Sequence, residues 1–198
     1  MANNLAVKDA SGTARDIKTT DTASVHTPHH NVDSLPALVA GEAHIGALGG
    51  NSTIVPITFT LDTAAYASGD VLADTQALAA AVRTNAGFGV VASIVLNDED
   101  DKGNALDVVF LDANTSLGTE NAAPSISDAN ARNILGIVSV AAGDWTNIGG
   151  VRVATLRNIN LPIKGASGST SVYIALISKG TGTYTASGIT GRISILQD

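Results

Sequence analysis

The chain has 198 residues with 18 acidic and 11 basic side chains, and its net charge of −7 disfavours binding to a nucleic-acid backbone. It is 44% hydrophobic and only 15% charged, which excludes a disordered chain, because such chains are poor in hydrophobic residues and rich in charge. Cysteine is absent, so disulfides, thiolate metal sites and cysteine nucleophiles are excluded as well. The length suits one domain, with or without an arm.

Residues 1–33 are predicted to form an N-terminal arm that contains a hairpin. Two alternating segments, residues 5–9 and 15–19, flank a turn rich in Asp, Ser and Gly. Large aliphatic side chains are few here, so the hairpin has too little apolar surface to be stable alone. We expect the arm to dock on a partner surface through these side chains, with a frayed terminus as the alternative. They are Leu5, Val7, Ile17 and Val25.

Residues 34–50 are expected to be a linker, and residues 51–198 to form an antiparallel β-sandwich or jelly roll. Short β-like runs separated by turn residues favour these folds over alternating strands and helices. Leu106, Val108 and Phe110 recur at every second position, so we expect their side chains to face the core together. The runs are residues 54–61, 89–96, 105–111, 150–156, 158–163, 171–178 and 191–196.

The connections give weaker signals. A run rich in Asp and Asn between two strands predicts a hairpin turn at residues 100–104. Residues 74–83 are rich in helix formers, but their alanines set no period, and an edge strand fits equally well. Residues 125–131 carry a Ser-x-x-Asp cap after a proline and predict one short helix that continues to about Leu135. Pro56 indicates an edge strand or a strand start.

Three histidines are the first candidates for metal binding. His26, His29 and His30 lie near Asp33, and imidazoles with a carboxylate suit zinc or nickel. A structural zinc site needs ligands on a defined scaffold, and a Thr-Pro pair interrupts any helix that would align these residues. We therefore favour a polar loop, in which the histidines form hydrogen bonds to the backbone or to a neighbouring subunit.

Asp98 and Asp100 are candidate calcium ligands in the acidic run. An EF-hand loop that begins at Asp98 would need an oxygen ligand where Lys102 stands and a glutamate where Val109 stands. Turn hydrogen bonds from Asp and Asn explain the run better, and a different oxygen-lined calcium site at the loop tip is left open. Neither candidate set is strong enough to assign a metal, and we expect no cofactor.

The sequence shows no pattern for nucleophilic catalysis. There is no Gly-x-Ser-x-Gly elbow, and one tryptophan and three tyrosines provide few platforms for a glycosidase. Residues 165–170 are rich in Gly and Ser but lack the Lys-Ser/Thr pair of a phosphate-binding loop, so we expect a hairpin loop there. We therefore expect that the chain is not an enzyme.

No membrane or export signal is visible. The N-terminus lacks the basic and apolar regions of a secretory signal. The longest apolar stretches, such as residues 88–96, are shorter than the roughly 18–20 residues of a membrane helix. We expect synthesis in a cytoplasm, with no membrane and no nucleic acid among the partners.

Several segments resemble virion proteins of tailed bacteriophages: residues 7–12, 17–20, 25–34, 66–72, 94–111, 127–131, 166–175 and 184–188. The similarity spans most of the chain and includes no catalytic motif, so it assigns no role to individual residues. It implies a capsid decoration (cement) protein or a related head-fibre protein, built on a β-sandwich and usually oligomeric. The implied location is the capsid surface of the virion. The implied partners are the major capsid protein and further copies of the chain, in a homotrimer.

A binding module is the alternative to this role. A receptor-binding or carbohydrate-binding sandwich of a phage fibre would have the same fold class, so the fold alone does not separate the two functions. A lectin-like site would show clustered exposed aromatic residues and a formed calcium loop. Flat β surfaces and an arm that adds strands to neighbours fit the decoration role better.

Overall fold

The computed structural model describes residues 4–8, 10–22, 25–28 and 51–198. The chain divides into an N-terminal unit, Met1–Leu48, and a sandwich unit, Gly49–Asp198. Strands dominate the described part of both units. Within the described residues, no helix is both long enough and apolar enough to cross a membrane.

The N-terminal unit contains a three-stranded antiparallel sheet in the order β1-β2-β3. The predicted hairpin is present: β1 (Asn4–Lys8) pairs with β2 (Ala14–Thr22), and Gly12 supplies a positive φ of 80° in the turn. The chain then adds β3 (Val25–Pro28), a strand that we did not predict, against the far end of β2. The two edges of this sheet are therefore β1 and β3.

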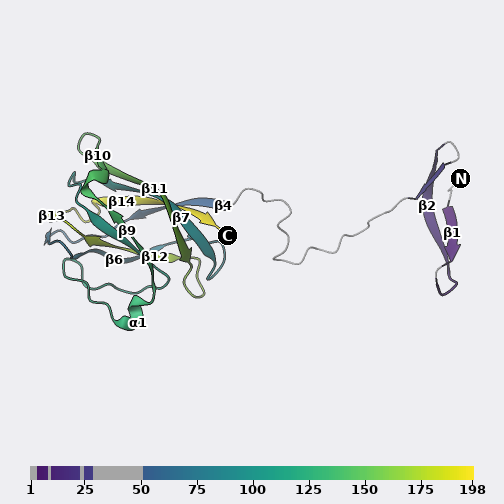
Figure 1. The fold of residues 1–198 in the computed structure, drawn as a ribbon, viewed down its shortest axis with the longest axis horizontal. Coiled ribbons are helices and arrows are strands. Elements are labelled where there is room, and N and C mark those ends of the chain that lie inside the picture. The colour runs from purple at the N-terminus through teal and green to yellow at the C-terminus, as the bar shows by residue number, and fades with distance from the viewer. Residues whose placement is uncertain (1–3, 9, 23–24, 29–50) are drawn as a thin grey trace. The chain divides into compact units, whose positions relative to one another are not determined.

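The sandwich unit consists of two main antiparallel sheets (Figure 1). The five-stranded sheet has the order β10-β11-β7-β14-β4 and the four-stranded sheet the order β6-β12-β8-β9. The former contains β4 (Asn51–Thr58), β7 (Phe88–Asp98), β10 (Trp145–Asn147), β11 (Arg152–Lys164) and β14 (Ile189–Gln197). The latter contains β6 (Val71–Leu78), β8 (Leu106–Leu111), β9 (Ile134–Val140) and β12 (Val172–Ser178). The chain is thus an all-β protein, as predicted.

Three short elements complete the unit. A two-stranded sheet joins β5 (Ala65–Tyr66) to β13 (Gly182–Thr183). The helix α1 (Asp128–Ala131) lies between β8 and β9, and a 3-10 turn, η1 (Ala142–Asp144), precedes β10.

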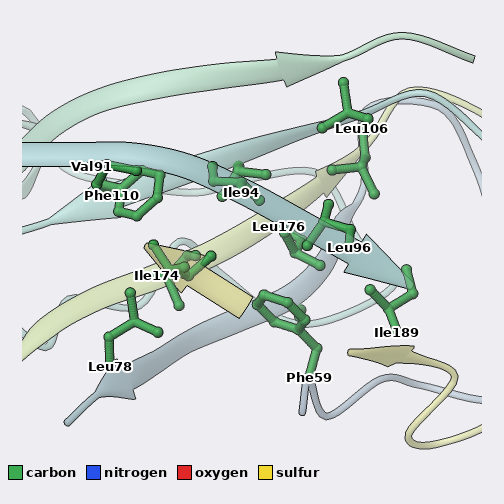
Figure 2. Close-up of a cluster of buried hydrophobic side chains, with 14 of the residues drawn as sticks. Phe59, Leu78, Val91, Ile94, Leu96, Leu106, Phe110, Ile174, Leu176 and Ile189 are labelled. Carbon is green, nitrogen blue, oxygen red and sulfur yellow. The ribbon is translucent and has the colours of Figure 1, made fainter. Parts of the chain in front are cut away.

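The main core consists of aliphatic and aromatic side chains from both sheets. Ile94 of β7 and Ile174 of β12 belong to this cluster, and both are fully buried (Figure 2). Leu106, Val108 and Phe110 are at most 1% exposed and belong to the same cluster, which confirms that these alternating side chains of β8 face the core together.

A second, smaller cluster lies on the opposite face of the four-stranded sheet. Residues 112–133, here called the covering segment, place Leu117 and Ile126 against that face. Backbone bonds hold the segment there, because Val71 donates to the carbonyl of Ala122 (2.8 Å) and accepts from the Asn121 amide (2.9 Å). The full cluster comprises Val71, Val109, Leu111, Leu117, Ala175, Ile126, Ile134, Tyr173 and Ile177. The outer face of this sheet is therefore covered over β8 and β12, whereas Ile137 of the edge strand β9 stays exposed.

Two predicted hairpins are wrong. β7 and β8 lie in different sheets, so residues 99–105 cross between the layers. Residues 165–171, which join β11 to β12, also cross between sheets. Turn residues are equally suited to a hairpin and to a crossover, because both reverse the chain, and so their composition does not distinguish the two.

The predicted helix is present but shorter than expected. The cap is Ser127 and not Ser125, which begins the predicted Ser-x-x-Asp motif, and the Ser127 hydroxyl accepts a bond from the backbone amide of Asn130 (3.3 Å). The helix ends at Ala131, and Leu135 lies in β9, because this segment pairs along the edge of β8. Residues 74–83 form the end of the edge strand β6 and the turn after it, so the edge-strand alternative is correct. Pro56 lies in β4, which is an edge strand as predicted.

Candidate functional site

The predicted docking residues and histidines belong to the N-terminal unit. Leu5 of β1 is paired with Ile17 of β2, Val7 is also in β1, and Val25 begins β3. His26 lies in β3 at the register position opposite Asp21, so it belongs to a strand and not to the predicted polar loop. His29, His30 and Asp33 lie outside the described residues.

The acidic loop between β7 and β8 is held by its own carboxylates. Asp98 is 1% exposed and accepts bonds from the backbone amides of Asp100 (3.0 Å), Lys102 (2.9 Å) and Gly103 (2.6 Å). Asp100 in turn accepts from the amide and hydroxyl of Thr185 (2.8 and 3.1 Å). Asp98 and Asp100 therefore form the loop hydrogen bonds that we predicted, although the loop connects the two sheets and does not close a hairpin.

A third carboxylate of this loop, Asp101, is also engaged. Asp101 accepts from the Arg152 guanidinium (2.7 Å) and from the Asn147 amide (2.9 Å), which ties the loop to the neighbouring strands of the five-stranded sheet. Within the described part of the chain, no group of three or more His, Asp or Glu side chains is placed to hold a metal ion.

The outward surface of the five-stranded sheet, here called the open face, carries exposed apolar side chains. Ile54, Leu196 and Phe88 are 63%, 51% and 58% exposed. The register places Ile54 opposite Ser194 and Leu196 opposite Val90, so the apolar residues lie on three adjacent strands, β4, β14 and β7. Val55 and Ile195, the chain neighbours of Ile54 and Leu196, point into the core, as strand alternation requires.

The open face also differs in charge from the chain as a whole. The strands of its sheet contain one acidic residue, Asp98, which is buried, and four basic residues. The basic residues are Arg152, Arg157, Lys164 and Arg192. Arg157 and Arg192 are exposed on outward register positions, whereas Arg152 is paired with Asp101. An apolar surface with arginine and without acids is the composition typical of a protein interface.

The sequence contained a signal for this face that we did not use. The segments that form its strands lack acidic residues apart from Asp98, in a chain with 18 acids and 11 bases. Only the sheet order shows that these distant segments are neighbours. By contrast, the outer face of the four-stranded sheet exposes one large apolar side chain, Ile137, at 55%.

A depression of about 520 Å³ lies where several loops meet at one end of the sandwich. Residues after β8, before β9 and after β11 line it, together with Tyr173 of β12. Its polar lining residues are Asp112, Asn114, Asn133, Lys164, Ser167 and Tyr173. Loop clusters of this kind are common positions for ligand sites on β-sandwiches.

Two buried tyrosines join the small sheet to the core. The Tyr66 hydroxyl donates to the carbonyl of Leu72 (3.0 Å) and accepts from the Asp62 amide (2.6 Å), and burial raises the pKa of this phenol from 10.0 to about 12. Burial also raises the pKa of Tyr184, which accepts a bond from Asn104. The two rings meet edge to face with centroids 6.0 Å apart.

The geometry thus offers two surfaces with distinct chemistry, the open face and the depression. The first is apolar and basic and extends over neighbouring strands of one sheet. The second is concave and polar.

In comparisons with known proteins, no family model and no curated protein matches the chain.

Proposed function

We propose that the chain is a structural virion protein that decorates and stabilises a bacteriophage capsid by binding the shell of major capsid protein. The observation that carries the proposal is the open face, an apolar and acid-free sheet surface on an otherwise acidic protein. The resemblance to tailed-phage virion proteins suggests the identity of the partner. In this role the chain has no catalytic task, and it acts as a homotrimer on the outside of the shell.

The physical basis of attachment is burial of apolar surface. Removing a large apolar side chain from water contributes about 1.5–3 kcal/mol when burial is complete, so Ile54, Leu196 and Phe88 provide a moderate affinity per copy. Linked copies in one oligomer increase the total attachment without new kinds of contact. Arg157 and Arg192 favour an acidic patch on the partner, so attachment should weaken as salt increases.

Binding to undecorated capsids tests the proposal. The purified chain should sediment with capsids of the phage that encodes it, and electron microscopy should show added density at fixed symmetry positions. Leu196→Asp and Ile54→Asp place a charge on the open face and should weaken binding at least about tenfold, which corresponds to about 1.4 kcal/mol.

Ile137→Asp is the matched control. Ile137 is as exposed as Leu196 but lies on the outer face of the other sheet, so its substitution should leave capsid binding unchanged. Urea denaturation of all three variants checks that they are folded. The proposal fails if the wild-type chain does not bind capsids, or if Ile137→Asp weakens binding as much as the two open-face variants.

A further inference from the structure

The depression at the loop end of the sandwich unit has no part in the proposed capsid binding through the open face. Its volume of about 520 Å³ falls within the roughly 300–1,000 Å³ of small-ligand sites. Four separate stretches of the chain converge on it, namely the loops that contain Ala86, Asp112, Asn133 and Gly165, and Tyr173 of β12 adds an aromatic side chain.

The polar side chains of the depression are available to a ligand. Within the described residues, the side chains of Asp112, Asn114, Lys164, Ser167 and Tyr173 form no hydrogen bond or ion pair with another side chain or with the backbone. Asn133, in contrast, donates to the Thr115 hydroxyl (2.8 Å). Together the available groups supply a carboxylate acceptor, an ammonium donor, an amide and two hydroxyls.

The backbone around the depression is fixed before any ligand arrives. The Asp112 amide donates to the Asn133 carbonyl (2.9 Å), which closes the covering segment at its ends. On the opposite wall, the Gly165 amide donates to the Gly87 carbonyl (2.8 Å) and the Ala86 amide to the Ser169 carbonyl (2.9 Å). A site that is already ordered loses less conformational entropy when it binds.

Tyr173 contributes an apolar surface at a defined position. Its side chain packs against the second cluster and is only partly buried, and the same residue lines the depression. An aromatic ring held in this way can pack against the C–H face of a pyranose, while its hydroxyl remains able to form a hydrogen bond.

We propose that this depression binds a neutral saccharide unit. The lining has one carboxylate, Asp112, and one ammonium, Lys164, so its charges balance and do not select an anion or a cation. Neighbouring hydroxyls of a sugar match this set, because a hydroxyl both donates to a carboxylate and accepts from an ammonium or an amide. The single carboxylate makes a divalent-cation site a poor fit.

Titration of the full chain with four neutral probes tests the proposal. The probes are methyl α-glucoside, methyl α-galactoside, methyl α-mannoside and N-acetylglucosamine. Their binding is monitored in ¹H–¹⁵N NMR spectra of the chain. At least one should shift the backbone amides of Asn114, Asn133 and Ser167, with a dissociation constant of about 1 mM or tighter. Asp112→Asn removes the negative charge and replaces one of the two acceptor oxygens with a donor, so it should weaken that binding about tenfold.

Asp128→Asn is the matched control, because it makes the same change of charge on the exposed helix α1, outside the depression. Its binding should equal that of the wild type. Glucuronate and inorganic phosphate are titrated in parallel as charged probes. The proposal is overturned if no neutral probe shifts these amides, if Asp112→Asn binds like the wild type, or if only a charged probe binds. No capsid is present in this experiment, so its result is independent of the decoration proposal.

Discussion

Asp98, a buried carboxylate, holds the crossover loop through its hydrogen bonds. It satisfies three backbone amides, so Asp98→Ala would leave three donors without a partner in a partly buried loop. We expect a loss of about 3 kcal/mol in the free energy of unfolding, measured by urea denaturation. Asp98→Asn keeps an acceptor oxygen and should lose less.

The neighbouring Glu99 provides the control for this prediction. Glu99 is exposed, and its side chain has no hydrogen bond to a described residue, so Glu99→Ala should change stability by less than about 0.5 kcal/mol. Equal losses for Asp98→Ala and Glu99→Ala would show that the hydrogen bonds of Asp98 do not stabilise the loop.

The Tyr66 phenol makes stability depend on alkaline pH. In the unfolded chain it ionises near pH 10, whereas in the folded chain its pKa is about 12, so unfolding releases a proton between these values. The contribution of the neutral phenol to the free energy of unfolding is fully present below pH 10. It declines by about 2–3 kcal/mol as the pH rises to 12. Urea denaturation at pH 9 and pH 11 should show the decline, and Tyr66→Phe should reduce it. An unchanged slope in Tyr66→Phe would contradict this assignment.

Among the elements, the covering segment has a larger role than its single short helix suggests. Leu117 is 2% exposed and belongs to the second cluster on the outer face of the four-stranded sheet. Leu117→Ala should lower the free energy of unfolding by about 2–3 kcal/mol, because a buried side chain is truncated and a cavity remains. Thr119→Ala, at an exposed position of the same segment, should have little effect in the same urea measurement. Similar stabilities of the two variants would mean that the segment does not seal the sheet.

The elements also show what the sequence reveals about the fold. Alternation along β8 predicted the burial of Leu106, Val108 and Phe110, because the two-residue period is a property of any strand. The period does not specify the partner strand, and this is why two crossovers were taken for hairpins. The segment after α1 was assigned to the helix because a cap preceded it and Gly136 could end it, and only pairing with β8 shows that this segment is a strand.

For the whole molecule, the decoration proposal includes a homotrimer that depends on the N-terminal unit. Deleting residues 1–48 removes a separate unit, so the sandwich should keep its melting temperature within about 2 °C. Light scattering should report a trimer for the full chain and a smaller species after the deletion. A truncated protein that unfolds, or one that remains a trimer, would contradict this role of the unit.

The candidate surfaces were predictable only in part at this scale. The acid-free segments of the open face are visible in the sequence, but the apolar surface exists because β4 and β14 are neighbours although they are far apart in the chain. The depression combines loops from four regions of the chain, and no spacing between Asp112 and Tyr173 indicates that they share a cavity. Tertiary arrangement, and not local pattern, defines both surfaces.

The position of β14 has a consequence for how the protein folds during synthesis. This strand lies between β7 and β4, and β4 ends at Thr58 whereas β14 begins at Ile189, so β4 has no neighbour in its sheet until the last strand has been made. Such a high contact order makes folding slow, because distant segments must meet before their contacts stabilise them. A ribosome-bound chain that lacks β14 would therefore expose unpaired strand edges and apolar side chains, and it would require chaperones until translation of β14 is complete.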